Sequence, residues 1–117
     1  MPTIHDVVRA LSGRAGVDAV IILGRDGLVI DSHAGNGIDS EGVSALIPSM
    51  VTASSRLGDA AGRGEFHTGV VEFASGMLLV VSITPETLLA ILVAPDTNVG
   101  SLLYEIERHR SAIASLL

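Results

Sequence analysis

The alternation of apolar and polar positions is most informative in residues 16–32, where two apolar runs, 17–23 and 28–30, flank residues 24–27. An Asp-Gly pair between apolar runs is typical of a β-hairpin, because glycine tolerates the positive φ of a tight turn. The first run does not alternate, which predicts a strand buried on both faces. The second run alternates, so we expect a more exposed strand beside the first.

Helical periodicity marks both ends of the chain. Thr3 and Asp6 predict a capped helix start, and Gly13 is a natural stop after it. Thr97 or Asn98 is expected to cap a final helix. The apolar positions of the first helix are Ile4, Val7, Val8 and Leu11, and those of the last are Leu102, Leu103, Ile106, Ile113, Leu116 and Leu117.

A long helix is predicted between them, over residues 38–62, with Asp39 or Ser40 as its cap. Pro48 should kink or split this helix, because proline cannot donate the hydrogen bond to the carbonyl of Ser44. The helix is rich in small residues, which either pack on the chain's own sheet or allow close pairing with a second copy. The predicted inward positions are Val43, Leu46, Ile47, Met50, Ser54, Leu57 and Ala61.

Three further strands are expected, over residues 65–74, 77–83 and 88–94. The first mixes polar and apolar residues, as an edge or interface strand does, whereas the other two are continuous apolar runs. The predicted order is αββαβββα. Hairpin-joined strands with intervening helices favour an antiparallel sheet in an α+β domain.

Composition bounds the class of protein. The length of 117 residues fits one domain over 1–117. Apolar residues make up 48% and charged residues only 17%, below the roughly 25% of ordinary domains. No apolar run reaches the ~18–20 residues of a membrane span, so we expect no direct membrane insertion and a second protein chain over the apolar surplus. The N-terminus shows no signal-peptide pattern, which predicts a cytoplasmic location.

Charge and residue chemistry exclude several functions. The net charge is −6, and the seven basic residues are scattered arginines, which argues against nucleic acid as a partner. The absence of cysteine excludes disulfides and thiolate chemistry. The four histidines lack metal-site spacing, and no phosphate loop or nucleophile elbow is present. We therefore expect no active site, no metal and no cofactor.

Asp31, Ser32 and His33 are the residue types of a hydrolytic triad, but adjacent strand residues point to opposite faces. Asp31 and His33 should share one face while Ser32 points away from them. The segment is expected to be a solvated polar edge. Residues 35–37 should be a flexible connection rather than a phosphate-binding nest.

The element order, the RDGL block within residues 16–32 and the small-residue helix with Arg56-Leu57-Gly58 resemble the roadblock family. This family includes dynein-associated roadblock light chains and bacterial polarity regulators of the MglB kind. The resemblance implies a profilin-like, five-stranded antiparallel sheet with helices on both faces. It also implies a homodimer with paired third strands and adjacent second helices, which scaffolds or activates small Ras-like GTPases.

Carried onto this chain, the resemblance implies a dimer interface of Phe66, His67, Val70, Val71, Phe73, Leu46 and Met50. It places partner docking at Ser49, Ala53 and Arg56. Arg56 or Arg63 is either an arginine finger supplied to the GTPase or an ordinary solvated helix residue. The alternative function, from another class, is a small-molecule sensor that uses the sheet as a ligand cup.

Overall fold

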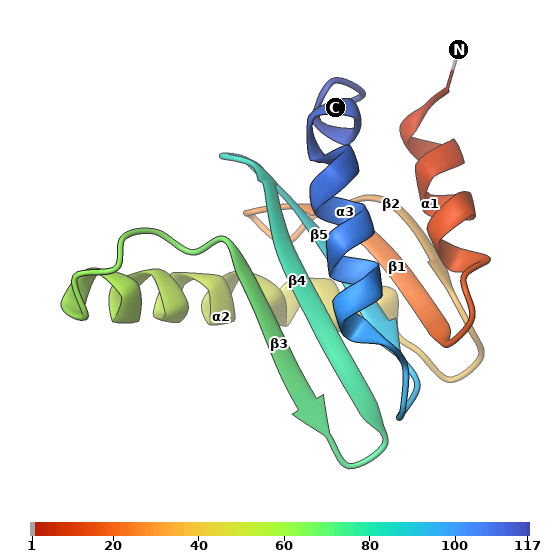
Figure 1. Cartoon of the computed structure of the whole chain (residues 1–117), viewed down its shortest axis with the longest axis horizontal. Coiled ribbons are helices and arrows are strands. Elements are labelled where there is room, and N and C mark those ends of the chain that lie inside the picture. The colour runs from red at the N-terminus through yellow and green to blue at the C-terminus, as the bar shows by residue number, and fades with distance from the viewer. Residues whose placement is uncertain (1) are drawn as a thin grey trace.

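A computed structural model describes residues 2–117 and shows a five-stranded antiparallel sheet with three helices (Figure 1). The elements are α1 (Ile4–Ser12), β1 (Val17–Gly24), β2 (Val29–Ala34), α2 (Ser40–Ala60), β3 (Thr68–Phe73), β4 (Gly76–Thr84), β5 (Thr87–Val93) and α3 (Val99–Ala114). The sheet order is β2-β1-β5-β4-β3. The predicted αββαβββα order and the fold class are confirmed.

The central strands explain the continuous apolar runs. All residues from 19 to 23 in β1 are buried, and β1 pairs with β2 on one side and β5 on the other. Strand β2 lies at one edge of the sheet and is more exposed than β1, and the greater exposure is what its alternation predicts. The hairpin between them turns at Gly27, whose φ of +89° is in the left-handed region that favours glycine.

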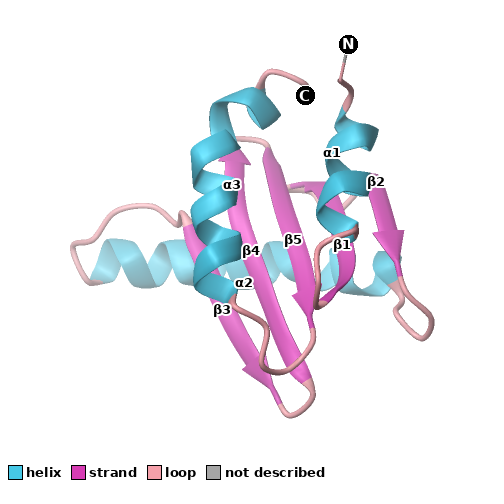
Figure 2. Ribbon diagram, turned by 45° about the vertical axis from the view of Figure 1, so that its right-hand side comes forward, coloured by secondary structure: helices cyan, strands magenta, loops and turns pink. Residues whose placement is uncertain are grey.

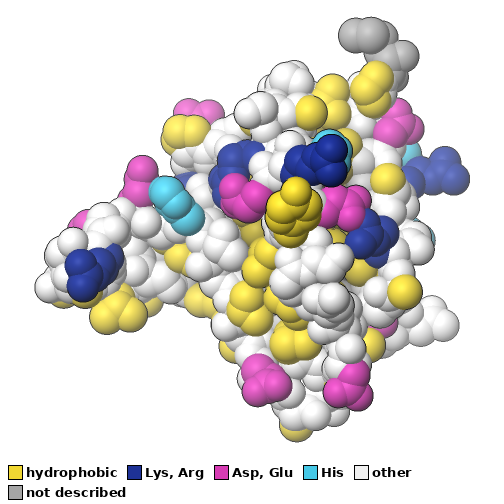
Figure 3. Space-filling model, in the orientation of Figure 1, with side chains coloured by type: hydrophobic (Ala, Val, Ile, Leu, Met, Phe, Trp, Pro, Cys, Tyr) yellow, Lys and Arg dark blue, Asp and Glu magenta, His cyan; other side chains and the backbone are white. Residues whose placement is uncertain are grey.

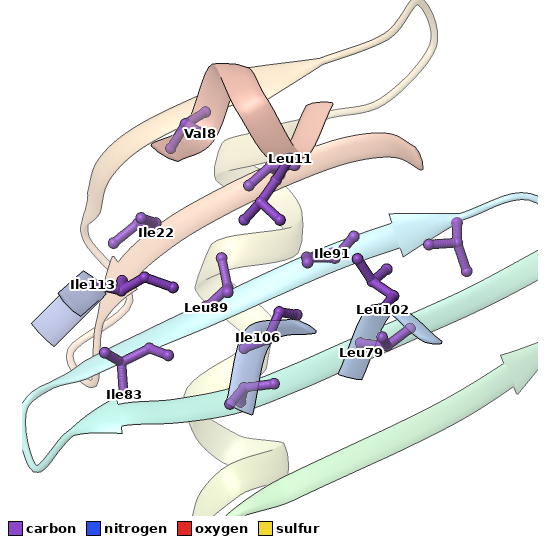
Figure 4. Packing of buried hydrophobic residues seen from close by; sticks show 13 residues of the cluster. Val8, Leu11, Ile22, Leu79, Ile83, Leu89, Ile91, Leu102, Ile106 and Ile113 are labelled. Atoms are coloured by element: carbon purple, nitrogen blue, oxygen red, sulfur yellow. The ribbon is translucent and has the colours of Figure 1, made fainter. Parts of the chain in front are cut away.

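The helices form a layer on each face of the sheet (Figure 2). Helices α1 and α3 cover one face, where 13 buried apolar residues form a cluster (Figure 4). Val8 and Leu11 of α1 and Ile106 of α3 pack there against strand residues such as Ile22 and Leu89. Helix α2 covers the other face, where a second cluster includes Ile47 and Val51.

Local signals set the helix starts as predicted. Thr3 and Asp6 form a reciprocal capping box at α1, and Asn98 caps α3 through the backbone N–H of Ser101. The hydrogen bond that the backbone N–H of Thr3 donates to the carboxylate of Asp6 lowers the pKa of Asp6. Asp39 caps α2 through the N–H of Gly42.

Helix α2 is continuous across Pro48, so the predicted split does not occur. The turn of the first hairpin supports this region, because the buried Ser44 hydroxyl donates to the carbonyl of Gly27 at 2.7 Å. A Cβ atom at Gly27 would lie 3.3 Å from the Ser44 carbonyl oxygen and 3.4 Å from Pro48 Cγ. Glycine therefore permits the close approach of the hairpin to this helix.

The predicted inward face of α2 is partly wrong. The buried positions are Ser44, Ile47 and Val51, whereas Leu46 and Leu57 are 75% and 71% exposed. Ala61 lies beyond the helix and is also exposed. The Ser44 hydrogen bond and the packing of Ile47 on the sheet fix which face of α2 points inward. This face is rotated about the helix axis from the one that the apolar residues alone predicted.

The third strand is shorter than predicted. Strand β3 covers Thr68–Phe73 instead of residues 65–74, because its ladder with β4 begins at the pair of Thr68 and Val81. Beyond this pair only the carbonyl of His67 accepts a hydrogen bond, from the N–H of Ser82. The end of β4, at residues 82–84, thus extends past the start of β3.

Candidate interaction surface

One flank of α2 exposes large apolar side chains. Leu46 and Leu57 are separated by 11 residues, or about three helical turns, and therefore lie on the same flank. Met50, one turn after Leu46, is partly buried beside the second core cluster. We call Leu46, Met50 and Leu57 the pairing flank of α2. This flank is a candidate surface for contact with another protein, since apolar patches left in water mark such surfaces.

The second half of α2 extends beyond the sheet (Figure 1). None of its residues after Val51 is buried. At Gly58 the chain returns closely beneath the helix, and a Cβ atom there would lie 2.1 Å from the carbonyl oxygen of Gly64. The projecting half is thus a regular helix, and the loop that follows it folds back closely against its last turn. No part of the sheet lies under this half of the helix.

Ser49, Ala53 and Arg56 are all exposed on the outer side of α2, opposite the buried Ile47 and Val51. These three residues, which we call the docking face, line a shallow hollow together with Pro48 and Thr52. Arg56 belongs to none of the ion pairs formed by residues 2–117. The structure therefore brings together the three residues that were assigned to docking.

The residues assigned to the dimer interface on the β3 side divide into two groups. Val70 and Phe73 are 47% and 55% exposed, and His67 is exposed beside the start of the strand. Phe66 and Val71 pack instead against the core cluster under α2. Strand β3 is the outer strand and pairs only with β4, so its other edge presents backbone N–H and C=O groups.

The triad-like segment in β2 does not form a catalytic arrangement. Asp31 and His33 pair with Ile22 and Val20, whose side chains face α1 and α3, whereas Ser32 is on the opposite face of the sheet. The carboxylate of Asp31 instead contacts Nδ1 of His5 at 2.9 Å, a pair that the sequence did not reveal. Within residues 2–117, no group of three or more potential metal ligands occurs.

Charged side chains of both signs are visible on the face that carries α3 (Figure 3). Arg14 pairs with Glu105 and links the segment after α1 to α3. Arg110 pairs with Glu107 one turn earlier in α3, and its hydrogen bond lowers the pKa of Glu107. These ion pairs lie on the opposite side of the sheet from the docking face.

Among the described residues, no helix is sufficiently long and apolar to span a membrane.

Comparison with known proteins identifies the family. The model of the Roadblock/LC7 domain family matches residues 3–93. Two uncharacterized proteins of Methanocaldococcus jannaschii are each 26% identical over 113 residues, which cover 97% of this chain and 98% of each relative.

Solved structures share the fold. Myxococcus xanthus MglB superposes with a TM-score of 0.87 at 21% identity, over 97% of this chain and 93% of that chain. A Roadblock/LC7 domain from Streptomyces avermitilis gives a TM-score of 0.84 at 22% identity, over 96% and 95%. The gliding protein MglB of Thermus thermophilus gives 0.84 at 16% identity, over 97% and 87%.

Proposed function

Because the chain belongs to the Roadblock/LC7 domain family, we propose that it is a non-catalytic, homodimeric regulatory or scaffold protein that binds a small Ras-like GTPase. The observation that carries this proposal is the outer surface of α2. There the exposed Leu46 and Leu57 of the pairing flank lie beside the small residues of the docking face. A helix that leaves large apolar side chains in water is stabilised when a partner covers them.

Strand β3 supports pairing with a second copy. Its free edge can accept an antiparallel strand, and two identical edges related by a two-fold axis satisfy each other's backbone groups. In such a dimer Val70 and Phe73 would pack against side chains of the partner strand, which removes exposed apolar surface. A continuous sheet of two copies thus accounts for the open edge of β3.

Helix α2 contributes to the same assembly. We propose that the pairing flanks of two α2 helices lie side by side, because the projecting half of each helix has no sheet beneath it. A homologous structure, described as MglB with tetrameric arrangement, superposes with a TM-score of 0.85 at 17% identity and is itself an assembly. Two docking faces would then form one composite platform with an Arg56 on each side.

The composite platform suits a partner with a negatively charged bound nucleotide. The docking face combines small side chains, which allow close backbone approach, with the guanidinium of Arg56, which has no ion-pair partner among residues 2–117. Arginine can stabilise charge on a phosphoryl group or pair with carboxylates of a partner. We propose that a GTP-loaded Ras-like protein docks on this platform, and that this chain itself supplies no hydrolytic site.

A substitution at the edge of β3 tests the dimer. Val70→Lys should increase the dimer dissociation constant at least about tenfold, because two lysines would face each other near the two-fold axis. Val70 is preferable to Val71, which packs partly in the core and would report on folding as well. Analytical ultracentrifugation measures the effect, and Tyr104→Lys, at an exposed position of α3, is the matched control. A monomeric unmodified protein at micromolar concentration would contradict the pairing.

A substitution on α2 tests the docking. Ala53→Trp should abolish GTPase binding by overlap with the partner while leaving the core intact, because Ala53 is exposed. Arg108→Ala on α3, which is also exposed, should leave affinity unchanged. The measurement is calorimetric titration with a Ras-like GTPase loaded with a GTP analogue, after circular dichroism has confirmed folding. Normal binding by Ala53→Trp together with a loss in Arg108→Ala would place docking on the other face of the sheet.

A further inference from the structure

A polar recess lies where β4 extends past β3. Its volume is about 580 Å³, within the range of small-molecule sites. The end of β4, the turn that follows it and the segment before β3 form its walls. Helix α2 adds Ser55, and helix α3 adds Glu107 and Arg110. The recess exists because the ladder of β3 ends at Val81, so residues 82–84 have no neighbouring strand on that side.

Two arginines from distant parts of the chain meet at Ser82. Arg25, in the turn between β1 and β2, donates to the Ser82 hydroxyl, and Arg110 of α3 donates to the Ser82 carbonyl. Both guanidinium groups line the recess. The two contacts approach one residue from different elements, which holds both cations at the same end of the sheet.

Among residues 2–117, only one of these two arginines has a carboxylate partner. Arg110 pairs with Glu107, whereas Arg25 belongs to none of the three ion pairs formed by residues 2–117. Nε of Arg25 is buried, and within the same residues it has no hydrogen-bond partner. A buried, unpaired donor on a charged group is costly, and an anion in the recess would remove that cost.

Further polar side chains line the recess together with Arg25. Ser55 of α2 and Thr84 of β4 contribute hydroxyl groups to the lining, and His67 contributes an imidazole. Guanidinium and hydroxyl groups together are the donors that carboxylates and phosphates prefer. The remaining carboxylate of the lining, Glu65, is exposed and is outside ion-pair distance of Arg25.

We propose that this recess binds the phosphate or carboxylate group of a small anionic ligand, with Arg25 as the principal contact. The hydroxyl groups of Ser55 and Thr84 complete the oxyanion's hydrogen bonds. The recess is larger than a single inorganic anion requires, so the natural ligand carries an organic part, which Phe66 of the lining can contact.

The site is separate from the proposed pairing of α2 helices. Ser55 follows Leu46 by nine residues, which is about half a turn away around the helix axis. The recess therefore opens on the flank of α2 opposite the pairing flank. The proposal does not depend on GTPase binding, and either can fail without the other.

The test is a ¹H–¹⁵N NMR titration with sodium phosphate and, separately, with sodium citrate, at constant ionic strength. We expect saturable shifts of the backbone signals of Arg25, Ser55, Ser82 and Thr84. Tighter binding of phosphate identifies a phosphate-bearing ligand class, and tighter binding of citrate identifies a carboxylate-bearing class. The absence of saturable shifts in both arms would overturn the proposal.

Variants separate binding from general charge effects. Arg25→Gln should weaken binding at least about tenfold, because it removes the charged donor. Arg63→Gln, which removes an exposed arginine after α2, should leave it unchanged. Ser55→Asp retains Arg25 but places a carboxylate in the recess, and it should weaken binding similarly even if Arg25→Gln fails to fold. Equal affinity in Ser55→Asp and the unmodified protein would overturn the proposal.

Discussion

The two faces of the sheet differ in how completely one chain covers them. Under α1 and α3, 13 buried apolar residues form a core cluster, whereas the cluster under α2 has eight. The smaller cluster reflects the position of α2, whose buried residues end at Val51 although the helix continues to Ala60. One face thus stabilises the fold, and the other leaves half of a helix available for contact with another protein.

The two halves of α2 repeat this contrast. In the first half, Ser44 and Ile47 attach the helix to the hairpin turn and to the sheet. In the second half, Leu57 faces solvent and the chain returns closely at Gly58. Because isolated short helices are marginal in water, the projecting half depends on its continuity with the packed half. A substitution that loosens the packed half of α2 should therefore also reduce the helicity of the exposed half.

The largest expected effect is on the face of α1 and α3. Ile106→Ala should lower the free energy of unfolding by about 2–5 kcal/mol, because it leaves a cavity in the larger core cluster. Leu57→Ala, the matched control on the exposed half of α2, should instead act through association and be sensitive to protein concentration. Urea denaturation at several concentrations distinguishes the two. Equal, concentration-independent losses in both variants would remove the contrast between the faces.

An intermediate effect is expected where α2 contacts the hairpin. Ser44→Ala should lower the free energy of unfolding by about 1–2 kcal/mol, because the carbonyl oxygen of Gly27 loses the hydrogen bond that the Ser44 hydroxyl donates. Ser49→Ala, one turn further on the exposed side, should change stability by less than about 0.5 kcal/mol. Thermal unfolding followed by circular dichroism measures both variants. A neutral Ser44→Ala would show that the apolar contacts alone hold α2 in place.

The smallest expected effect concerns the surface ion pair of α3. The hydrogen bond from Arg110 lowers the pKa of Glu107 below its usual 4.5. The pair therefore contributes stability above pH 4.5, and this contribution is lost as the pH falls through the lower folded value. Glu107→Gln should flatten this part of the pH dependence of the melting temperature. An unchanged slope in the variant would assign the acid sensitivity to other carboxylates, such as Asp6 in its capping box.

Much of the fold could be predicted from short-range patterns. The caps at Thr3 and Asn98, the hairpin turn at Gly27 and the buried run of β1 all depend on neighbouring residues, so the sequence indicated them correctly. The rotation of α2 could not be predicted in this way. It depends on the contact of Ser44 with Gly27, which are 17 positions apart, and on where the sheet ends beneath the helix.

The candidate sites show the same division. Ser49, Ala53 and Arg56 share one side of α2 because helical spacing places them there. The contact of His5 with Asp31 and the meeting of Arg25 and Arg110 at Ser82 join residues 26 to 57 positions apart. No periodicity in the sequence encodes such contacts.

The sequence by itself determined the element order, the turns, the caps and the strands that are buried on both faces, because each follows from local backbone preference and from the period of apolar residues. Only the tertiary structure decided that Leu46 and Leu57 face solvent and that β3 starts late enough to leave a recess beside β4. It also placed Arg25 in this recess with no carboxylate partner among the residues that the structure describes. These features depend on where one element ends relative to another, which is settled when the layers pack.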